Sequence, residues 1–352
     1  MYPRIVADKE KLNHNAATVL SMCHQHGISQ TFLVTKVLAG NVSLVSELAH
    51  HDFTYIADSR WQNLAKFSGI DKKKALLRLP MKAEIAKVVK YADLSLNSEI
   101  STIRLLDQEA AKQKRIHEVL LMFDLGDLRE GLFYEDECLP VVREILGLRQ
   151  IRLRGIGTNL TCYGGLIPTY DVLMRLVRIQ KHIEQTLPIK LAIVSGGNSS
   201  SFHLFNASAI PKEINSLRFG EIVFLGRETA YGRLLPGLHA DCFRLEAQLI
   251  EIQTKPSFPI GEIGMNSFGE TPAIVDEGLM RRGILAVGKQ DVMPDNLYPF
   301  AGDVRILGGS SDHLLVALPK DRYDVGDIMG FGMNYPGLLQ LMTSPYVRKT
   351  VV

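Results

Sequence analysis

One lysine in the sequence stands where it could do covalent chemistry. Lys36 follows the apolar run 32–34 after a single threonine, and the small-residue turn behind it ends at Gly40. An ammonium group at the end of a buried strand is costly, because low-dielectric surroundings favour the neutral amine. The neutral amine is the form that attacks a carbonyl, so the position suits a Schiff base with pyridoxal phosphate (PLP). The alternative is a lysine whose charged end simply reaches solvent at the rim of the fold.

A second stretch of the chain could bind a phosphate group. The run SGGNSSS at 195–201 joins a glycine turn to one amide and three hydroxyl side chains. Backbone amides in such a turn, together with serine hydroxyls, form an anion cradle. A further glycine turn, Arg218-Phe219-Gly220, follows soon afterwards. The alternative for the serines is a helix N-cap on a flexible turn, but the two turns together favour phosphate binding.

The elements that position these residues are short apolar strands that alternate with helical patterns. The predicted strands are 31–36, 53–57, 75–79, 93–97, 117–124, 151–158, 190–195 and 215–218. Strands that alternate with helices form parallel βαβ units, and eight of them within about 200 residues predict an α/β fold with a (β/α)8 TIM barrel. Barrel chemistry lies at the carboxyl ends of the strands, and phosphate most often binds after the seventh and eighth.

The pattern changes at a Gly/Pro-rich linker near 232–239. Beyond it the segments that alternate like strands are 244–253, 282–288, 304–309 and 313–318. They predict a smaller antiparallel β-domain, and an opening strand at 4–7 is expected to pair into it. The expected domains are therefore 1–8 with the β-domain, 9–232 as the barrel, and 233–352 as the C-terminal β-domain.

The composition excludes several classes of protein. The chain has 46% hydrophobic and 22% charged residues with a net charge of +2, which disfavours nucleic acid or an acidic membrane as partner. No apolar run is long enough to span a bilayer, and the N-terminal residues lack the pattern of a signal peptide. The four cysteines form no C-x-x-C pair, so we expect neither a disulfide framework nor a structural zinc site, and a cytoplasmic location.

Eleven short motifs stand in one order along nearly the whole chain. They are TKVLAG (35–40), IADSR (56–60), SLNSE (95–99), DLGDLREG (124–131), GIGTNLTCYGG (155–165), SGGNSSS (195–201), LRFGEIVFLGRE (217–228), PIGEIG (259–264), GKQDV (288–292), GGSSDH (308–313) and MTSPYV (342–347). The set resembles the fold-type III PLP enzymes, the alanine racemase-like barrels with a C-terminal β-domain, and within them the ornithine racemase branch. The resemblance implies a PLP-dependent racemase that interconverts free L- and D-amino acids, with ornithine, another basic amino acid or alanine as substrate.

The resemblance assigns a role to most of the residues singled out above. Lys36 matches the lysine that binds PLP and acts as one of two proton-transfer bases. Arg218 matches the arginine that hydrogen-bonds the pyridine nitrogen; a guanidinium only donates, so that nitrogen stays unprotonated, which suits proton exchange and discourages transamination. The other implied cofactor contacts are Arg129, Asn159, Asn198, Ser199, Ser200, Gly220, Glu221 and Tyr346. Asn159 departs from the family, which commonly carries a histidine there.

The second base is where the sequence departs most from the family. A racemase needs a donor and an acceptor on opposite faces of the substrate Cα. Alanine racemases carry a tyrosine for this in a Gly-Tyr-Ala-Asp stretch, whereas this chain has Gly-Lys-Gln-Asp at 288–291. The candidates are Lys289, which the alignment favours, His313 and Tyr335. Asp312 matches an aspartate that helps to fix the substrate; the alternative is an aspartate that caps a turn.

Substrate and partner follow from the same resemblance. A basic side chain needs a carboxylate near the entrance, and Glu262, Glu270, Asp291 and Asp312 lie in β-domain segments that could supply it. The resemblance also implies a homodimer in which the β-domain of one subunit completes the barrel mouth of the other.

Three competing functions remain to be compared. A basic amino-acid decarboxylase of this fold would need an acidic partner for the pyridine nitrogen and a cysteine near the C-terminus, and no cysteine lies beyond Cys242. A PLP-carrier protein would end near the eighth strand. A metal-dependent enzyme would need clustered ligands in the β-domain, where His239, Cys242 and His313 match no trusted metal-site spacing.

Overall fold

The computed structural model describes residues 1–133, 135–205, 209–266, 268–269, 271 and 273–352. It divides into two compact units, Glu10–Ala240 on one side and Met1–Lys9 together with Asp241–Val352 on the other. Each unit is described by itself. No helix within the described residues has the length and apolar character needed to cross a membrane.

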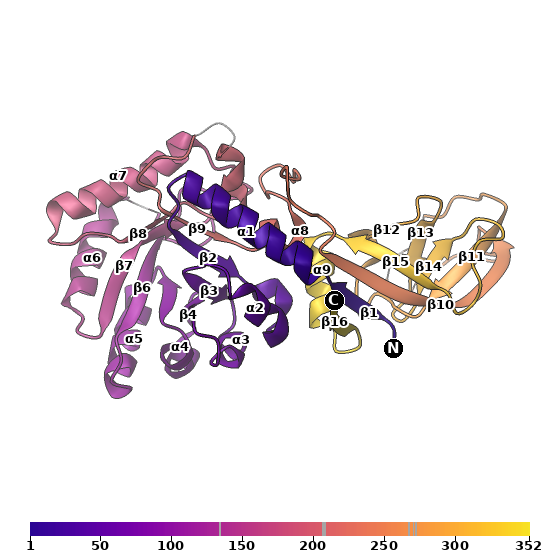
Figure 1. Cartoon of the computed structure of the whole chain (residues 1–352), viewed down its shortest axis with the longest axis horizontal. Coiled ribbons are helices and arrows are strands. Elements are labelled where there is room, and N and C mark those ends of the chain that lie inside the picture. The colour runs from indigo at the N-terminus through magenta and orange to yellow at the C-terminus, as the bar shows by residue number, and fades with distance from the viewer. Residues whose placement is uncertain (134, 206–208, 267, 270, 272) are drawn as a thin grey trace. The chain divides into compact units, whose positions relative to one another are not determined.

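The unit Glu10–Ala240 is built around a closed barrel of parallel strands (Figure 1). The barrel strands are β2 (Gln30–Val34), β3 (Tyr55–Asp58), β4 (Lys73–Leu76), β5 (Leu94–Asn97), β6 (His117–Phe123), β7 (Ile151–Thr158), β8 (Ile193–Ser195) and β9 (Ser216–Phe219). The pairing of β2 with β9, which sets Phe32 beside Arg218, closes the ring. The predicted (β/α)8 barrel is thus confirmed.

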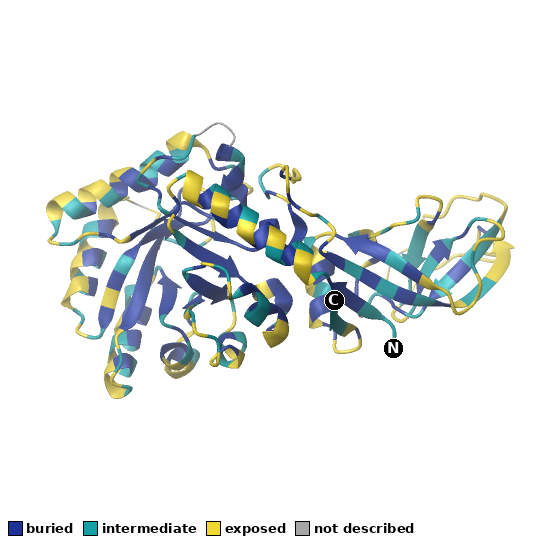
Figure 2. Cartoon of the chain, in the orientation of Figure 1, coloured by how far each residue is buried: buried dark blue, intermediate teal, exposed yellow. Residues whose placement is uncertain are grey.

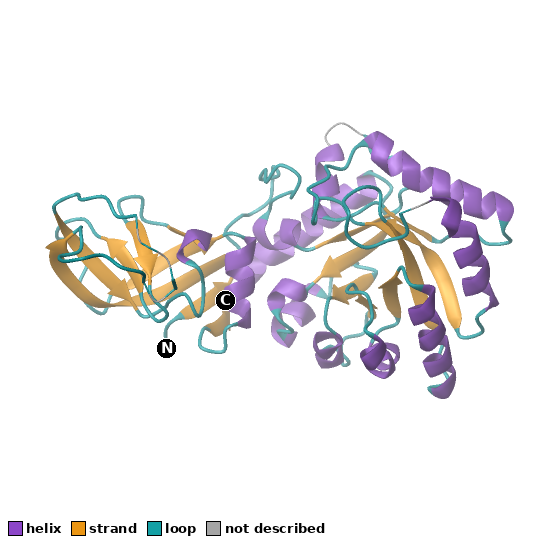
Figure 3. Ribbon diagram, turned by 180° about the vertical axis from the view of Figure 1, so that it is seen from behind, coloured by secondary structure: helices purple, strands orange, loops and turns teal. Residues whose placement is uncertain are grey.

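Helices surround the barrel, as Figure 3 shows from behind. They are α1 (Lys9–Gln25), α2 (Val42–Leu48), α3 (Trp61–Lys66), α4 (Ile85–Tyr91), α5 (Ile100–Lys112), α6 (Cys138–Gly147), α7 (Tyr170–Thr186) and α8 (Glu221–Leu225). Short 3-10 turns connect them, at η1 (Lys36–Leu38), η2 (Lys82–Glu84), η3 (Glu135–Glu137) and η4 (Ser199–Leu204). Helix α7 buries one apolar stripe, which includes Leu173, Leu176 and Ile183, and exposes the opposite side.

The barrel interior is a packed apolar core. Its side chains come from alternate positions of the strands, as expected when the inward residues of a parallel barrel stack in layers. The cluster consists of Phe32, Val34, Tyr55, Ala57, Ala75, Leu94, Leu96, Leu120, Met122 and Ile193. In Figure 2 most of the barrel strands are dark blue, and β3 and β5 are buried at every residue. Polar chemistry is therefore expected at the ends of the strands.

The second unit is a mostly antiparallel sheet. Its strands follow the order β12-β15-β10-β11-β14-β13, and β1 pairs with β10 and in parallel with β16. The elements are β1 (Arg4–Ala7), β10 (Phe243–Pro256), β11 (Leu279–Leu285), η5 (Pro294–Asn296), β12 (Leu297–Pro299), β13 (Arg305–Gly309), β14 (Leu314–Ala317), β15 (Ile328–Met333), α9 (Tyr335–Thr343) and β16 (Arg348–Val351). The opening strand pairs into this sheet, with Ile5 opposite Leu245.

Candidate active site

Lys36 is held at the carboxyl end of β2. The strand ends at Val34, two residues earlier than the predicted run 31–36, and Lys36 opens the 3-10 turn η1. Thr35 ties this point to the neighbouring strand β3: its amide donates to the Ala57 carbonyl at 2.7 Å and its hydroxyl to Asp58 Oδ2 at 3.0 Å. The lysine therefore leaves the barrel from a fixed position.

The surroundings of Lys36 disfavour its charged form. Its side chain reaches solvent, but the protein around the barrel end desolvates the ammonium and lowers its pKa. A side chain at the end of a ring of strands can touch water and still have protein on most sides. The positive charge of Arg129 lowers the pKa further. The negative charges of Asp58 and Glu221 act in the opposite direction.

Arg218 lies on β9, buried to 3% exposure. One terminal nitrogen donates to Ser195 Oγ, and the other donates to the Thr158 carbonyl at 2.5 Å and to Asn159 Oδ1 at 2.7 Å. Burial lowers the pKa of Arg218 to about 10, so the guanidinium is still charged at neutral pH. The hydrogen-bond acceptors in these contacts are all neutral.

The Glu130 carboxylate, which is not among the site residues predicted from the sequence, contacts both Asn159 and Arg129. The Asn159 side-chain amide donates to Glu130 Oε1, and Glu130 Oε2 pairs with Arg129 Nε at 3.0 Å. Glu130 stands next to Arg129 in the motif DLGDLREG, so its position in that motif was the available signal. Its partner Asn159 is 29 residues away. That contact depends on how two loops fold at the barrel end, which the spacing of the motif does not reveal.

The serine turn after β8 is held by its own asparagine. Asn198 accepts from the Ser200 amide at 2.8 Å and donates to the Leu160 carbonyl at 2.8 Å, which ties the turn to the loop after β7. Ser199 Oγ accepts from the Ile222 amide of α8 at 3.5 Å, so the turn also touches the segment after β9. The structure therefore brings the predicted residues of 198–200 and 218–221 together.

Ser200 differs from its neighbour Ser201. The Ser201 hydroxyl donates to the Gly196 carbonyl at 2.7 Å. The Ser200 hydroxyl is buried but has no hydrogen-bond partner within the described residues. Buried hydroxyls are normally satisfied, so the Ser200 hydroxyl, which follows the glycine turn, is available to bind a ligand group.

Two positions in these turns require glycine. Gly197 has a φ of +108°, which residues with a side chain rarely adopt. A Cβ on Gly220 would lie 2.4 Å from the Val34 carbonyl oxygen, so only glycine fits between β9 and β2. An unsatisfied Ser200 hydroxyl that follows a glycine turn and a lysine with a lowered pKa at the same end of the barrel suit the phosphate and the aldehyde of PLP. The residues present fit that cofactor.

The remaining predicted residues lie in the other unit. The amides of Lys289 and Gln290 donate to the carbonyls of Ser310 and Ser311, at 2.8 and 3.1 Å. A Cβ on Gly288 would lie 2.3 Å from the Ser311 oxygen, so the contact requires glycine. These bonds bring Lys289 beside the 310–313 turn that carries Asp312 and His313, while the Lys289 ammonium lies 4.0 Å from the centre of the Phe268 ring.

Tyr346 and Tyr335 occupy different positions in this unit. Tyr346 is 69% exposed, and its amide donates to Ser344 Oγ at 3.1 Å. Tyr335 is the first residue of α9, with Asn334 as the N-cap.

The four carboxylates predicted as readers of a basic side chain also differ. Asp291 is buried and accepts a hydrogen bond from Ser344 Oγ at 2.6 Å, which uses it structurally. Glu262 and Asp312 are exposed. Glu270 lies outside the described residues. Among the parts of the chain that the structure describes, no three His, Cys, Asp or Glu side chains gather in a way that could hold a metal ion.

The fold and the site together define a class of protein: a closed parallel barrel with a lysine-centred site at the strand ends and an antiparallel β-unit. The family model for the N-terminal domain of alanine racemase matches residues 7–228. The chain therefore belongs to the alanine racemase family.

Two curated relatives match along the full length. The chain is 45% identical over 354 residues to an ornithine racemase of Acetoanaerobium sticklandii, covering 100% of both chains. It is 36% identical over 352 residues to a lysine racemase of Thermotoga maritima, covering 99% of this chain and 98% of the relative.

Solved structures show the same fold at lower sequence identity. An alanine racemase of Clostridium difficile 630 matches with a TM-score of 0.77 and 16% identity, covering 100% of this chain and 96% of the other. An alanine racemase of Bartonella henselae, solved with covalently bound pyridoxal phosphate, matches with a TM-score of 0.74 and 15% identity over 100% of both chains.

Proposed function

We propose that the protein is a PLP-dependent racemase that interconverts the L and D forms of ornithine by two-base exchange of the α-proton. The observation that carries the proposal is the arrangement at the barrel end: Lys36 with its lowered pKa, the unsatisfied Ser200 hydroxyl and the buried guanidinium of Arg218. The full-length similarity to an ornithine racemase supports the choice of reaction and substrate.

Different residues at the barrel end would bind different parts of PLP. Ser200 and the amides of the glycine turns after β8 and β9 would take the phosphate, and Arg218 would donate to the pyridine nitrogen. Lys36 would bind the carbonyl carbon. When bound, PLP withdraws electrons from the substrate Cα and so makes its proton acidic enough to be removed.

Lys36 is suited to one half of the proton exchange. Because its surroundings favour the neutral amine, its Nζ can accept a proton at a pH where an ordinary lysine cannot. The base for the other face comes from the β-unit in our proposal, with Lys289 first, then His313 and Tyr335. Asp312, which follows directly after the carbonyl that accepts from the Gln290 amide, would help to fix the substrate.

The substrate assignment rests on charge. Ornithine carries a second amine, which requires a carboxylate or an equivalent acceptor where the side chain ends. Among the described candidates Asp312 and Glu262 are exposed and could serve, whereas Asp291 is engaged with Ser344. Lysine and alanine remain as alternatives, and the racemases that match this chain act by name on ornithine and on lysine.

We further propose a homodimer in the cytoplasm, with the β-unit of one subunit facing the barrel end of the other. The cytoplasmic location rests on the cysteine pattern of the sequence, which contains no C-x-x-C pair and so is typical of a reducing compartment. A composition with a net charge of +2 gives no reason to invoke nucleic acid or membrane partners.

The test is to incubate the PLP-loaded protein in D2O with L-ornithine, L-lysine and L-alanine separately, and to follow α-proton loss and optical rotation together. We expect both signals to decay, fastest with ornithine. Exchange without loss of rotation would mean a single base and would remove the two-base mechanism. If PLP stays bound and no amino acid exchanges, the protein is a PLP carrier and the racemase proposal is wrong.

A further inference from the structure

Within the described part of the chain, the positive charge of Arg218 has no carboxylate among its hydrogen-bond acceptors. The acceptors are Ser195 Oγ, the Thr158 carbonyl and Asn159 Oδ1. A charge buried to 3% exposure is costly unless a counter-charge lies close by. The question is where that counter-charge lies.

Asn159 connects the guanidinium to one. Its oxygen accepts from Arg218 at 2.7 Å, and its nitrogen donates to Glu130 Oε1. This orientation of the amide is the only one that both neighbours permit, because an arginine only donates and a carboxylate only accepts. Asn159 is itself buried, at 9% exposure, so the chain from Arg218 to Glu130 runs through the interior of the barrel end.

Glu130 also binds the second arginine of the site. Its other oxygen pairs with Arg129 Nε at 3.0 Å, and its side chain is 12% exposed against 46% for Arg129. The Glu130 carboxylate thus lies between the buried Arg218, which it reaches through Asn159, and the more exposed Arg129. Burial acts to lower the pKa of Arg218, and Glu130 is the foremost group that opposes this.

We propose that Glu130 is a positioning residue, which acts through Asn159 to keep the Arg218 guanidinium charged and aimed at the pyridine nitrogen of the cofactor. The proposal rests on the proposed function for the identity of that cofactor. It gives a physical reason for the asparagine at 159: an amide can accept from the arginine and donate to the carboxylate at once.

The consequence concerns the acidity of the guanidinium. A nearby negative charge makes Arg218 hold its protons more firmly, so it donates a hydrogen bond to the ring nitrogen without transferring the proton. Removing the charge makes the guanidinium more acidic and the ring a stronger electron sink, which promotes transamination of the substrate to its 2-oxo acid.

The first test uses the cofactor-free protein and a double-mutant cycle. The variants are Glu130→Gln, Arg218→Met and the pair together, with the Tm as readout. Glutamine keeps an acceptor for Asn159 and removes the charge together with the acceptor for Arg129. We expect Glu130→Gln to lower the Tm, and to lower it by less when Arg218 is already methionine, because the charge it compensates is then gone.

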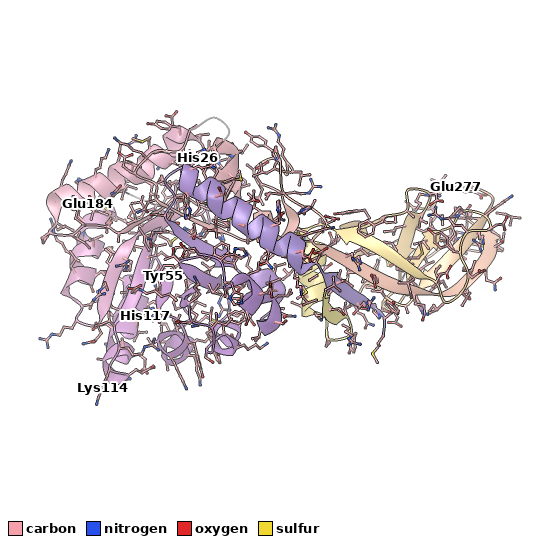
Figure 4. All side chains as sticks on the ribbon, in the orientation of Figure 1. His26, Tyr55, Lys114, His117, Glu184 and Glu277 are labelled. Atoms are coloured by element: carbon pink, nitrogen blue, oxygen red, sulfur yellow. The ribbon has the colours of Figure 1, made fainter. Side chains whose placement is uncertain are left out.

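Glu118 supplies a matched control. It is buried at the amino end of β6, at the opposite end of the barrel strands, and binds the Tyr55 hydroxyl at 3.1 Å and Lys73 Nζ at 3.2 Å. Figure 4 labels Tyr55 among the barrel strands. Glu118→Gln removes a buried carboxylate of similar exposure, so its Tm loss should be the same in the wild-type and the Arg218→Met backgrounds. If Glu130→Gln does not fold, Asn159→Ser, which keeps both charges and breaks the bridge, takes its place.

The second test measures the loaded protein. We expect Glu130→Gln to weaken PLP binding about tenfold, as for one charge-assisted hydrogen bond that loses its support, and to raise the 2-oxo acid formed per racemisation event. Glu118→Gln should change neither. If Glu130→Gln lowers the Tm equally in the wild-type and the Arg218→Met backgrounds, and does not change the affinity for PLP, the proposal is wrong. If the wild-type protein racemises nothing, the proposed function fails, while the cofactor-free cycle still decides the role of Glu130.

Discussion

Lys36 is costly to keep charged, and this cost can be measured without any substrate. Its pKa is lowered in the folded protein, chiefly by desolvation, so protonation of the folded state is less favourable than protonation of the unfolded chain. The stability cost is present in full at a pH below the lowered pKa. It disappears as the pH rises through that value towards the ordinary lysine value.

We therefore expect Lys36→Met to raise the Tm of the cofactor-free protein at pH 7, with a gain that shrinks as the pH is raised. Chemical denaturation at several pH values measures this. In the loaded protein the same variant should lose the yellow absorbance of bound cofactor and reduce α-proton exchange by about 10²–10⁴-fold, the usual loss with a general base. A yellow variant of full activity would show that Lys36 is not the cofactor lysine.

The second base is predicted to be Lys289, and the competing candidates are His313 and Tyr335. Lys289→Met should slow exchange from one enantiomer by about 10²–10⁴-fold and leave exchange from the other and PLP absorbance intact. His313→Gln and Tyr335→Phe, measured side by side, are the matched comparisons, since each removes one competing candidate. If the Lys289→Met variant racemises in both directions at the wild-type rate, Lys289 is not the second base. The second base is then His313 or Tyr335, whichever variant loses exchange from one enantiomer.

At the scale of elements, the 3-10 turn η4 (Ser199–Leu204) yields a prediction in which two adjacent serines behave oppositely. The Ser200 hydroxyl is buried and has no partner among the described residues, so Ser200→Ala should stabilise the cofactor-free protein by about 1 kcal/mol and weaken PLP binding about tenfold. Ser201→Ala removes a bonded hydroxyl and should destabilise the protein by about 1 kcal/mol. Urea denaturation and PLP titration measure both. A loss of stability in both variants would mean that Ser200 has a structural partner.

The elements of the barrel could be predicted from the sequence because each strand is a short apolar run bounded by turn residues. The observed β7, Ile151–Thr158, has the predicted bounds, whereas the strand predicted at 190–195 is only Ile193–Ser195. The serine turn and Arg218 could be predicted because both follow strand ends. Glu130 could not, because its importance comes from a contact with a residue on another loop.

The sequence predicts the β-unit less completely than the barrel, for a physical reason. β15 (Ile328–Met333) contains Gly330 and Gly332, which weaken a strand signal. A Cβ at Gly332 would lie 2.1 Å from the Tyr298 ring, so the glycine is explained only by the neighbouring β12. Helix α9 (Tyr335–Thr343) has a proline and a glycine in its first turn, which conceal its apolar stripe from a reading of periodicity. Long-range packing determines these elements.

At the scale of the whole molecule, the proposal that the site is shared between subunits can be tested by complementation. Lys36 and Lys289 belong to different compact units of the chain. If the barrel end of one subunit takes its second base from the β-unit of the other, then the Lys36→Ala homodimer and the Lys289→Met homodimer each lose racemisation, measured as the change in optical rotation. A hybrid of the two variants, however, contains one site with both lysines intact, because each subunit supplies what the other lacks.

When the two variants are unfolded and refolded together at equal concentration, about half of all dimers are hybrids. Each hybrid has one working site of two. The mixture should therefore recover about a quarter of the wild-type racemase activity. Each variant refolded alone is the control and should stay inactive. A mixture as inactive as its components, with hybrid formation verified by differential tags, would mean that both lysines act within one subunit. Recovery near a quarter would place the reaction between two chains and make dimer formation a requirement for catalysis.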